Sequence, residues 1–280
     1  ILAARLDRNG TLLDASPIEI TTTTEGSNSG RPAVAWNGSE FVVVWDGGSA
    51  MSTTISAGGV VGRKNEIVLP QRGWATNNVS HGIVWDGSAM FLIWTSSSYD
   101  SPFPCGECQT YEVWSAELDE SGAMIESPGR VLAAGARWAI VASIGADSLV
   151  VYQRQEGSTV EAVRVTDDHI GETLLIARHA IPQSVAVSDR DYVVTHYGTQ
   201  SGISSVSTVH PDGTVATQII PARQTAFDFG EALTVNAAGR ILVAIPQFVT
   251  SEDDPQKTWR LIGYTDDDLI PAGRMRAVRR

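Results

Sequence analysis

Cysteine, lysine and long apolar runs are all scarce in this chain of 280 residues. It has 2 cysteines and 2 lysines, and no apolar run approaches the roughly 20 residues of a membrane-spanning helix. The formal net charge is −12, with no basic stripe to offset it, which argues against nucleic acid or an anionic membrane as partner. The first residues also lack the basic, apolar and small-residue order of a signal peptide.

A repeated hairpin is the most informative feature that is present. Two clear copies run from Val34 to Trp45 and from Ile83 to Trp94, each with an Asn-Gly or Asp-Gly turn between apolar strands. Weaker copies end at Tyr152, His196 and Ile245, so the successive spacings are 49, 58, 44 and 49 residues. A period near fifty is typical of repeat architecture.

A second hairpin alternates with the first and carries an apolar residue followed four positions later by a turn residue. Its six copies begin at Leu6, Ile55, Leu118, Val165, Val209 and Tyr264. Two hairpins in series make a unit of four short strands, and such units at this period are typical of β-propeller blades. The sequence therefore predicts an all-β fold, a β-propeller with five complete four-stranded blades plus a half-blade, in a ring of six blades or more.

We expect a single propeller domain over residues 1–280. The expected blades cover residues 33–69, 82–132, 140–176, 185–220 and 233–277. Residues 1–20 supply only the last two strands of a further blade, which leaves an open sheet edge. An upstream segment is the favoured way to complete it, and another chain or a rearranged C-terminal segment are the alternatives.

The amino-acid sequences of the hairpins resemble a known group of repeats. The stretch from Trp36 to Asp46, and the stretch from Ala3 to Leu13, are similar to propeller-like repeats in large exported proteins of soil and predatory bacteria. The resemblance is sharp in the first two repeats and the opening half-blade. It implies a secreted or cell-surface propeller, and it brings no catalytic residues with it.

The only cysteine pair, Cys105 and Cys108, lies in the longest insertion, within the second blade. A redox pair of this spacing is expected at the start of a helix, and a zinc site needs two more ligands. We therefore interpret the pair as a disulfide that staples a loop in an oxidising compartment. No metal site is predicted, although the acidic runs 167–168, 252–254 and 266–268 leave calcium open as a cofactor.

The loops between blades are the expected place for a ligand, by analogy with other propellers. Each has an arginine in or beside it, and guanidinium groups bind carboxylate, sulfate or phosphate through two parallel hydrogen bonds. Aromatic side chains in the same loops offer faces for stacking on a sugar. The candidate ligand-binding residues are Arg72, Arg137, Arg178, Arg223, Trp74 and Trp138. The alternative is that these arginines are solvated and pair with nearby carboxylates.

Three functional hypotheses remain at this stage. The first is an exported, non-enzymatic scaffold that binds an anionic glycan or a protein partner, because no catalytic motif is present. The second is a carbohydrate-active enzyme, a hydrolase or lyase, whose paired carboxylates come from different blades and so leave no spacing pattern. The third is a structural subunit of an extracellular assembly.

Overall fold

The computed structural model describes residues 1–7, 9–22, 30–46, 50–70, 76–99, 109–166, 169–220, 232–235, 241–251, 254–265 and 270–271. At 30–31, at 76–81 and from 232 onward only the backbone is described. The described residues form strands and one short 3-10 helix, Glu156–Ser158. None of their helices has the length and apolarity to cross a membrane. The chain divides into two compact units, Ile1–Ser148 and Leu149–Arg280.

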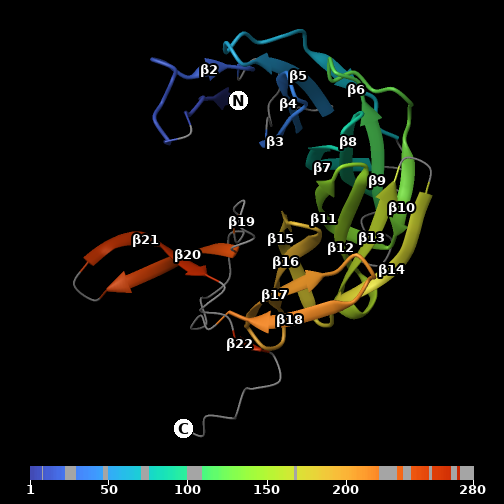
Figure 1. Ribbon diagram of the computed structural model, residues 1–280, viewed down its shortest axis with the longest axis vertical. Coiled ribbons are helices and arrows are strands. Elements are labelled where there is room, and N and C mark those ends of the chain that lie inside the picture. The colour runs from blue at the N-terminus through green and yellow to red at the C-terminus, as the bar shows by residue number, and fades with distance from the viewer. Residues whose placement is uncertain are drawn as a thin grey trace, which may run out of the picture. The chain divides into compact units, whose positions relative to one another are not determined.

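The first unit contains the half-blade and the first two blades (Figure 1). The half-blade is the two-stranded sheet of β1 (Leu2–Ala3) and β2 (Ile18–Glu19). The first blade consists of β3 (Gly30–Trp36), β4 (Glu40–Asp46), β5 (Ala50–Ser56) and β6 (Asn65–Ile67). The second consists of β7 (Thr76–Trp85), β8 (Met90–Tyr99), β9 (Gln109–Leu118) and β10 (Arg130–Ala134). Both are antiparallel and follow chain order.

The third blade begins in the first unit, and the boundary between the units falls within its second strand. It consists of β11 (Ala136–Ile144), β12 (Asp147–Arg154), β13 (Thr159–Thr166) and β14 (His169–Ala177). The fourth blade consists of β15 (Ala180–Ser188), β16 (Asp191–Gly198), β17 (Ser204–Val209) and β18 (Val215–Ile219). Of the fifth blade, three strands are described, β19 (Ala232–Val235), β20 (Ile241–Ser251) and β21 (Asp254–Thr265). The short β22 (Ile270–Pro271) pairs with β18.

The first turn of each clear hairpin is held by a side chain. Asn37 Oδ1 accepts hydrogen bonds from the backbone N–H groups of Ser39 (2.9 Å) and Glu40 (2.8 Å). Asp86 Oδ1 does the same for Ser88 (2.7 Å) and Ala89 (2.8 Å). Asn and Asp favour such turns because their short side chains satisfy the backbone locally. The repeated sequence thus builds the same turn twice, as predicted.

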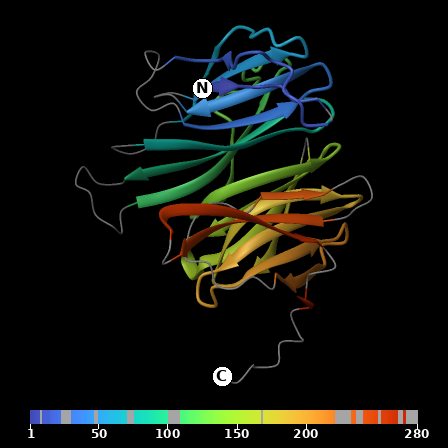
Figure 2. The same cartoon turned by 90° about the vertical axis from the view of Figure 1, so that its left-hand side faces the viewer.

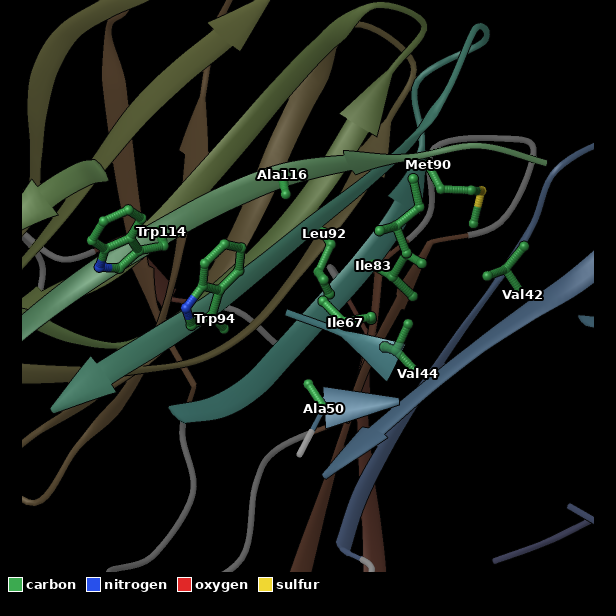
Figure 3. Close-up of a cluster of buried hydrophobic side chains, with 11 residues drawn as sticks. Val42, Val44, Ala50, Ile67, Ile83, Met90, Leu92, Trp94, Trp114 and Ala116 are labelled. Atoms are coloured by element: carbon green, nitrogen blue, oxygen red, sulfur yellow. The ribbon is translucent and has the colours of Figure 1, made fainter. Parts of the chain in front are cut away.

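Strand β4 of the first blade buries both of its faces. Val42 and Val44 belong to an apolar cluster with Leu92, Trp94 and other side chains of the second blade (Figure 3). Val43 and Trp45 point the other way, into a cluster with Ile20 and Ile55. Successive residues of a strand face opposite sides, so one strand contributes to two cores. Figure 2 shows the blue strands of the first blade layered over the teal strands of the second.

The two clear hairpins repeat tryptophan at equivalent strand positions, Trp36, Trp45, Trp85 and Trp94, and this repetition predicts packing between neighbouring blades. Trp45 and Trp94 are buried, and Trp85 packs against the same cluster as Trp94. Trp36 differs, because 41% of it is exposed while its ring lies 4.7 Å from that of Phe41. The expectation is confirmed for three of the four and wrong for Trp36.

Gly129 provides a test of the close packing beside Trp94. Its φ is +85°, and a Cβ there would lie 2.4 Å from the Ser115 carbonyl oxygen and 2.8 Å from Cη2 of Trp94. We expect Gly129→Ala to lower the free energy of unfolding by about 3 kcal/mol, through backbone strain and overpacking together. Gly10→Ala is the control, because its φ is +81° and nothing lies within 4 Å; its expected cost is roughly 1 kcal/mol. Urea denaturation measures the free energy of unfolding of both variants. An equal loss in the two would contradict the prediction, because it would show that the side chains beside Trp94 rearrange without cost.

Candidate functional site

The end of β8 is polar although it is buried. The strand starts with Met90, Phe91 and Leu92 in the core, and it finishes with the run Thr95–Ser98, all of which is buried. The Ser98 and Thr110 hydroxyls lie 2.9 Å apart on β8 and β9. Burying a polar group without a partner costs free energy, and Thr95 Oγ1 has no hydrogen-bond partner among the described residues.

Two stacked indoles mark the border between the apolar and polar parts of this sheet. The rings of Trp94 and Trp114 have centroids 6.0 Å apart and an interplanar angle of 17°. Trp114 Nε1 donates to Glu112 Oε2 at 3.1 Å. Trp94 Nε1 is buried and has no hydrogen-bond partner in the described part of the chain. Figure 3 shows both indole nitrogens on the ring side away from Leu92, so both N–H groups face the polar end.

Two carboxylates project from facing surfaces at this end. Glu112 lies on the same face of β9 as Trp114 and Ala116, which belong to the apolar cluster between the first two blades. Asp46 ends β4 on the same face as Val42 and Val44, from the other side of that cluster. Strand alternation therefore directs Asp46 and Glu112 toward the space between the same two sheets. Ser96 pairs with Glu112 across the strands and lies on this face as well.

The predicted residues Arg137 and Trp138 lie next to this sheet end, at the start of β11. The guanidinium carbon of Arg137 lies 4.1 Å from the centroid of the Trp138 ring and 5.6 Å from that of Tyr111. A cation over an aromatic face is held electrostatically. The backbone N–H of Gly135 donates to the Tyr111 carbonyl at 2.7 Å, which fixes the loop beside β9. Arg137 is half-buried, and 39% of Trp138 is exposed.

Trp138 has an uncommon backbone conformation. Its φ is +53°, in the left-handed region that costs a bulky residue free energy. In the second unit His179 repeats it, with a φ of +50°, in the sequence Ala-Arg-His-Ala where the first unit has Ala-Arg-Trp-Ala. Arg178 and His179 are both exposed. Strain of this kind gathers at functional sites, so both turns are candidates for ligand contact.

Several predicted residues lie outside the described residues. They are Arg72, Trp74, Arg223, Cys105 and Cys108, together with the acidic runs 167–168, 252–253 and 266–268. Among the residues that are described, no group of three or more His, Cys, Asp or Glu side chains is placed to hold a metal ion.

The polar side chains at the end of the third blade bind one another through an ion pair and a hydrogen bond. Arg154 forms an ion pair with Glu161 at 2.8 Å, and Thr159 Oγ1 donates to the same carboxylate at 2.9 Å. Burial raises the pKa of the neighbouring Tyr152, whose side chain is fully covered. This arrangement stabilises the blade and presents no free reactive oxygen, so we do not assign it to the site.

His196 stands where the clear hairpins have a tryptophan, which predicts a core histidine with a hydrogen-bond partner, and the structure confirms this. It is buried, its Nε2 lies 2.9 Å from Ser207 Oγ, and that hydroxyl lies 2.8 Å from Thr217 Oγ1. Burial lowers the pKa of His196 to about 4. The hydroxyls continue across three strands, so the imidazole belongs to a structural network.

Sequence reasoning found Arg137 and Trp138 but missed Asp46, Glu112 and Tyr111. Asp46 and Glu112 come from different blades, and nothing in their spacing indicates that they face one another. The one available signal was strand alternation, which places Asp46 in phase with Val42 and Val44.

Comparison with solved structures identifies the fold. A putative 6-phosphogluconolactonase from Bacteroides fragilis has a TM-score of 0.55 and 16% identity, over 96% of this chain and 77% of that one. Trypanosoma rangeli sialidase in complex with the inhibitor DANA has 0.53 and 11%, over 96% of this chain and 51% of that one. A protein of unknown function from Bacteroides caccae has 0.51 and 13%, over 95% and 87%. The chain has a β-propeller fold; no family model and no curated protein matches it.

These comparisons correct the main functional hypothesis. Two of the three similar structures carry the names of enzymes, a sialidase and a putative lactonase. The expectation of a non-enzymatic scaffold is therefore overturned, and the carbohydrate-active alternative is the better supported one. A propeller can assemble a site from separate blades, so the absence of a short catalytic motif does not argue against an enzyme.

The buried imidazole predicts a pH dependence of stability. A group with a pKa of about 4 in the folded chain and 6.5 in its ordinary state binds more protons when unfolded between these values. We therefore expect the free energy of unfolding to be fully retained above pH 6.5 and to fall by about 3 kcal/mol as the pH drops to 4. Denaturant melts at several pH values would measure this. His196→Phe should abolish that part of the slope, and an unchanged slope would contradict the assignment.

The strained turn predicts opposite effects on stability and binding. Trp138→Gly removes the left-handed strain of a bulky residue, so the melting temperature should stay the same or rise. If the exposed ring stacks on a sugar, saccharide affinity should fall about fivefold, because such a contact is worth about 1 kcal/mol. Trp36→Gly is the matched control, an equally exposed tryptophan in an extended strand, and it should lose stability and keep its affinity. A Trp138→Gly chain that is less stable and binds normally would show that the ring is structural.

Proposed function

We propose that this chain is a carbohydrate-active enzyme, a hydrolase acting on an anionic saccharide. The observation that carries the proposal is the pair Asp46 and Glu112, which project from facing surfaces of two neighbouring sheets at their polar end. Glycoside hydrolysis in most families needs two such carboxyl groups on either side of the scissile bond. The propeller fold, shared with a sialidase and a putative lactonase, supports the proposal.

The reaction needs a proton donor and a proton acceptor. Glu112 already accepts a hydrogen bond from Trp114, so we assign it as the acceptor, and Asp46 as the donor. Asp46 gives its proton to the leaving oxygen as the glycosidic C–O bond breaks. Water adds to the anomeric carbon and gives a proton to Glu112, so bonds and protons balance.

Arg137 and Trp138 are assigned to substrate binding. The guanidinium group offers parallel donors to a carboxylate or sulfate of the sugar, and the exposed indole offers a face for stacking. Tyr111 and Glu112 are consecutive on β9 and face opposite sides of the sheet. A saccharide of more than one unit could therefore contact Arg137 and still reach Glu112 across the sheet end.

The location that we propose for this enzyme is based on its sequence. The repeats resemble those of exported bacterial propellers, and a disulfide between Cys105 and Cys108 would suit an oxidising compartment. We therefore include a secreted or cell-surface location in the proposal.

Carboxylate variants test the assignment. Glu112→Gln and Asp46→Asn should each lower kcat by about 10²–10⁴-fold with little change in KM. Arg137→Ala should mainly raise KM for acidic saccharides. The assay follows new reducing ends on a panel of uronate, sulfated, sialylated and neutral glycans, with ultraviolet absorbance to detect the unsaturated product of a lyase.

The chain offers a matched control for Glu112. Glu117 lies on the same strand, is also half-buried and faces the other side at the far end. Glu117→Gln should leave kcat unchanged. Activity on no member of the panel would refute the proposed function, whereas full activity of both carboxylate variants would refute only their assignment.

A further inference from the structure

The half-blade leaves part of the first blade uncovered. Val34 and Trp36 of β3 are 59% and 41% exposed. Their repeat equivalents in the second blade are Ile83, which is 5% exposed, and Trp85, which packs against the apolar cluster. The residues are similar in each pair, so the difference in burial comes from what lies opposite them.

The second blade shows what is missing from the first. Ile83 and Trp85 are covered by the first hairpin of the preceding blade, through Ala33 and Ala35 of β3 and Val42 and Val44 of β4. The half-blade that precedes the first blade has only β1 and β2, the equivalents of β5 and β6. It contributes Ile1, Ala3, Ile18 and Ile20 to the cluster with Trp45, and no first hairpin.

In the described part of the chain, the half-blade also has an unpaired strand edge, next to the exposed face of β3. In the four blades with all strands described, the third strand is paired on both sides, as β5 is with β4 and β6. β1 is the equivalent of β5 and, among the described strands, pairs with β2 alone. An unpaired strand edge offers a row of N–H and C=O groups to a further strand.

We propose that the edge of β1, together with Val34 and Trp36, is a docking surface for a β-hairpin of the first-hairpin type. The occupant would pair antiparallel with β1. The residues of the hairpin that face the first blade would be small or branched and apolar, as Val42 and Val44 are, and would cover Val34 and Trp36. The exposed face of β3 and the unpaired edge of β1 are independent observations. A single hairpin would cover the face and pair with the edge.

A fused hairpin tests the proposal in the whole chain. Leu6 and Ile55 are equivalent, since each forms the same isolated bridge, to Leu12 and Val61 respectively, so Ile1 corresponds to Ala50. A second copy of residues 33–49 is therefore placed directly ahead of Ile1. We expect amide hydrogen exchange over residues 1–6 to slow at least tenfold and the melting temperature to rise.

The control fusion has the same length and a polar face. It carries Val42→Asp and Val44→Asp in the added copy only, and it should give neither protection nor stabilisation. Equal behaviour of the two fusions would overturn the proposal. So would slow exchange over residues 1–6 in the unmodified chain, and a concentration-dependent dimer protected there would assign the surface to a second copy instead.

Discussion

The structure depends on one constraint, that each sheet has two apolar faces and both must be covered. β4 shows it most simply, since Val42 and Val44 enter one core while Val43 and Trp45 enter another. Burial of each such side chain is worth about 1.5–3 kcal/mol, so a lone sheet would leave much of its stabilisation unused. Repetition solves this, because each copy covers the next. Val34 and Trp36 are exposed on the face of β3 that no described hairpin covers.

The candidate site lies at the end of the second blade where the buried side chains change from apolar to polar. Along β8 the alternation continues past Trp94 but the residues become Thr and Ser, and the buried Trp94 N–H has no partner among the residues that the structure describes. An unsatisfied buried donor costs about 1–3 kcal/mol. The proposed site is placed at this polar end of the sheet, where apolar packing stops.

The sequence predicted those features that arise from local chemistry. The Asn37 and Asp86 turns follow from side chains that bond their own backbone within three residues, and the burial of Trp94 follows from strand periodicity. The placement of Asp46 and Glu112 on strand faces that border the same apolar cluster was not predictable, because it depends on which sheets become neighbours. The left-handed conformation of Trp138 was also missed, since local propensity would put glycine there. The loop arginines were found from composition, and only the structure shows that Arg137 and Arg178 precede equivalent strained turns.

Differences between the repeats separate structure from function without any other sequence. Leu118 lies at the core end of β9, and its equivalents in the first, third and fourth blades, Ile55, Val165 and Val209, are apolar and at most 3% exposed, whereas Leu6 of the half-blade is 59% exposed. Trp114 lies four residues earlier, toward the polar end, and its equivalents are Met51, Glu161 and Ser205. A packing role would restrain both positions alike, because both lie on strands of the same register. The positions that vary are those near Glu112 and Arg137, so each blade presents its own chemistry at this end on a common core.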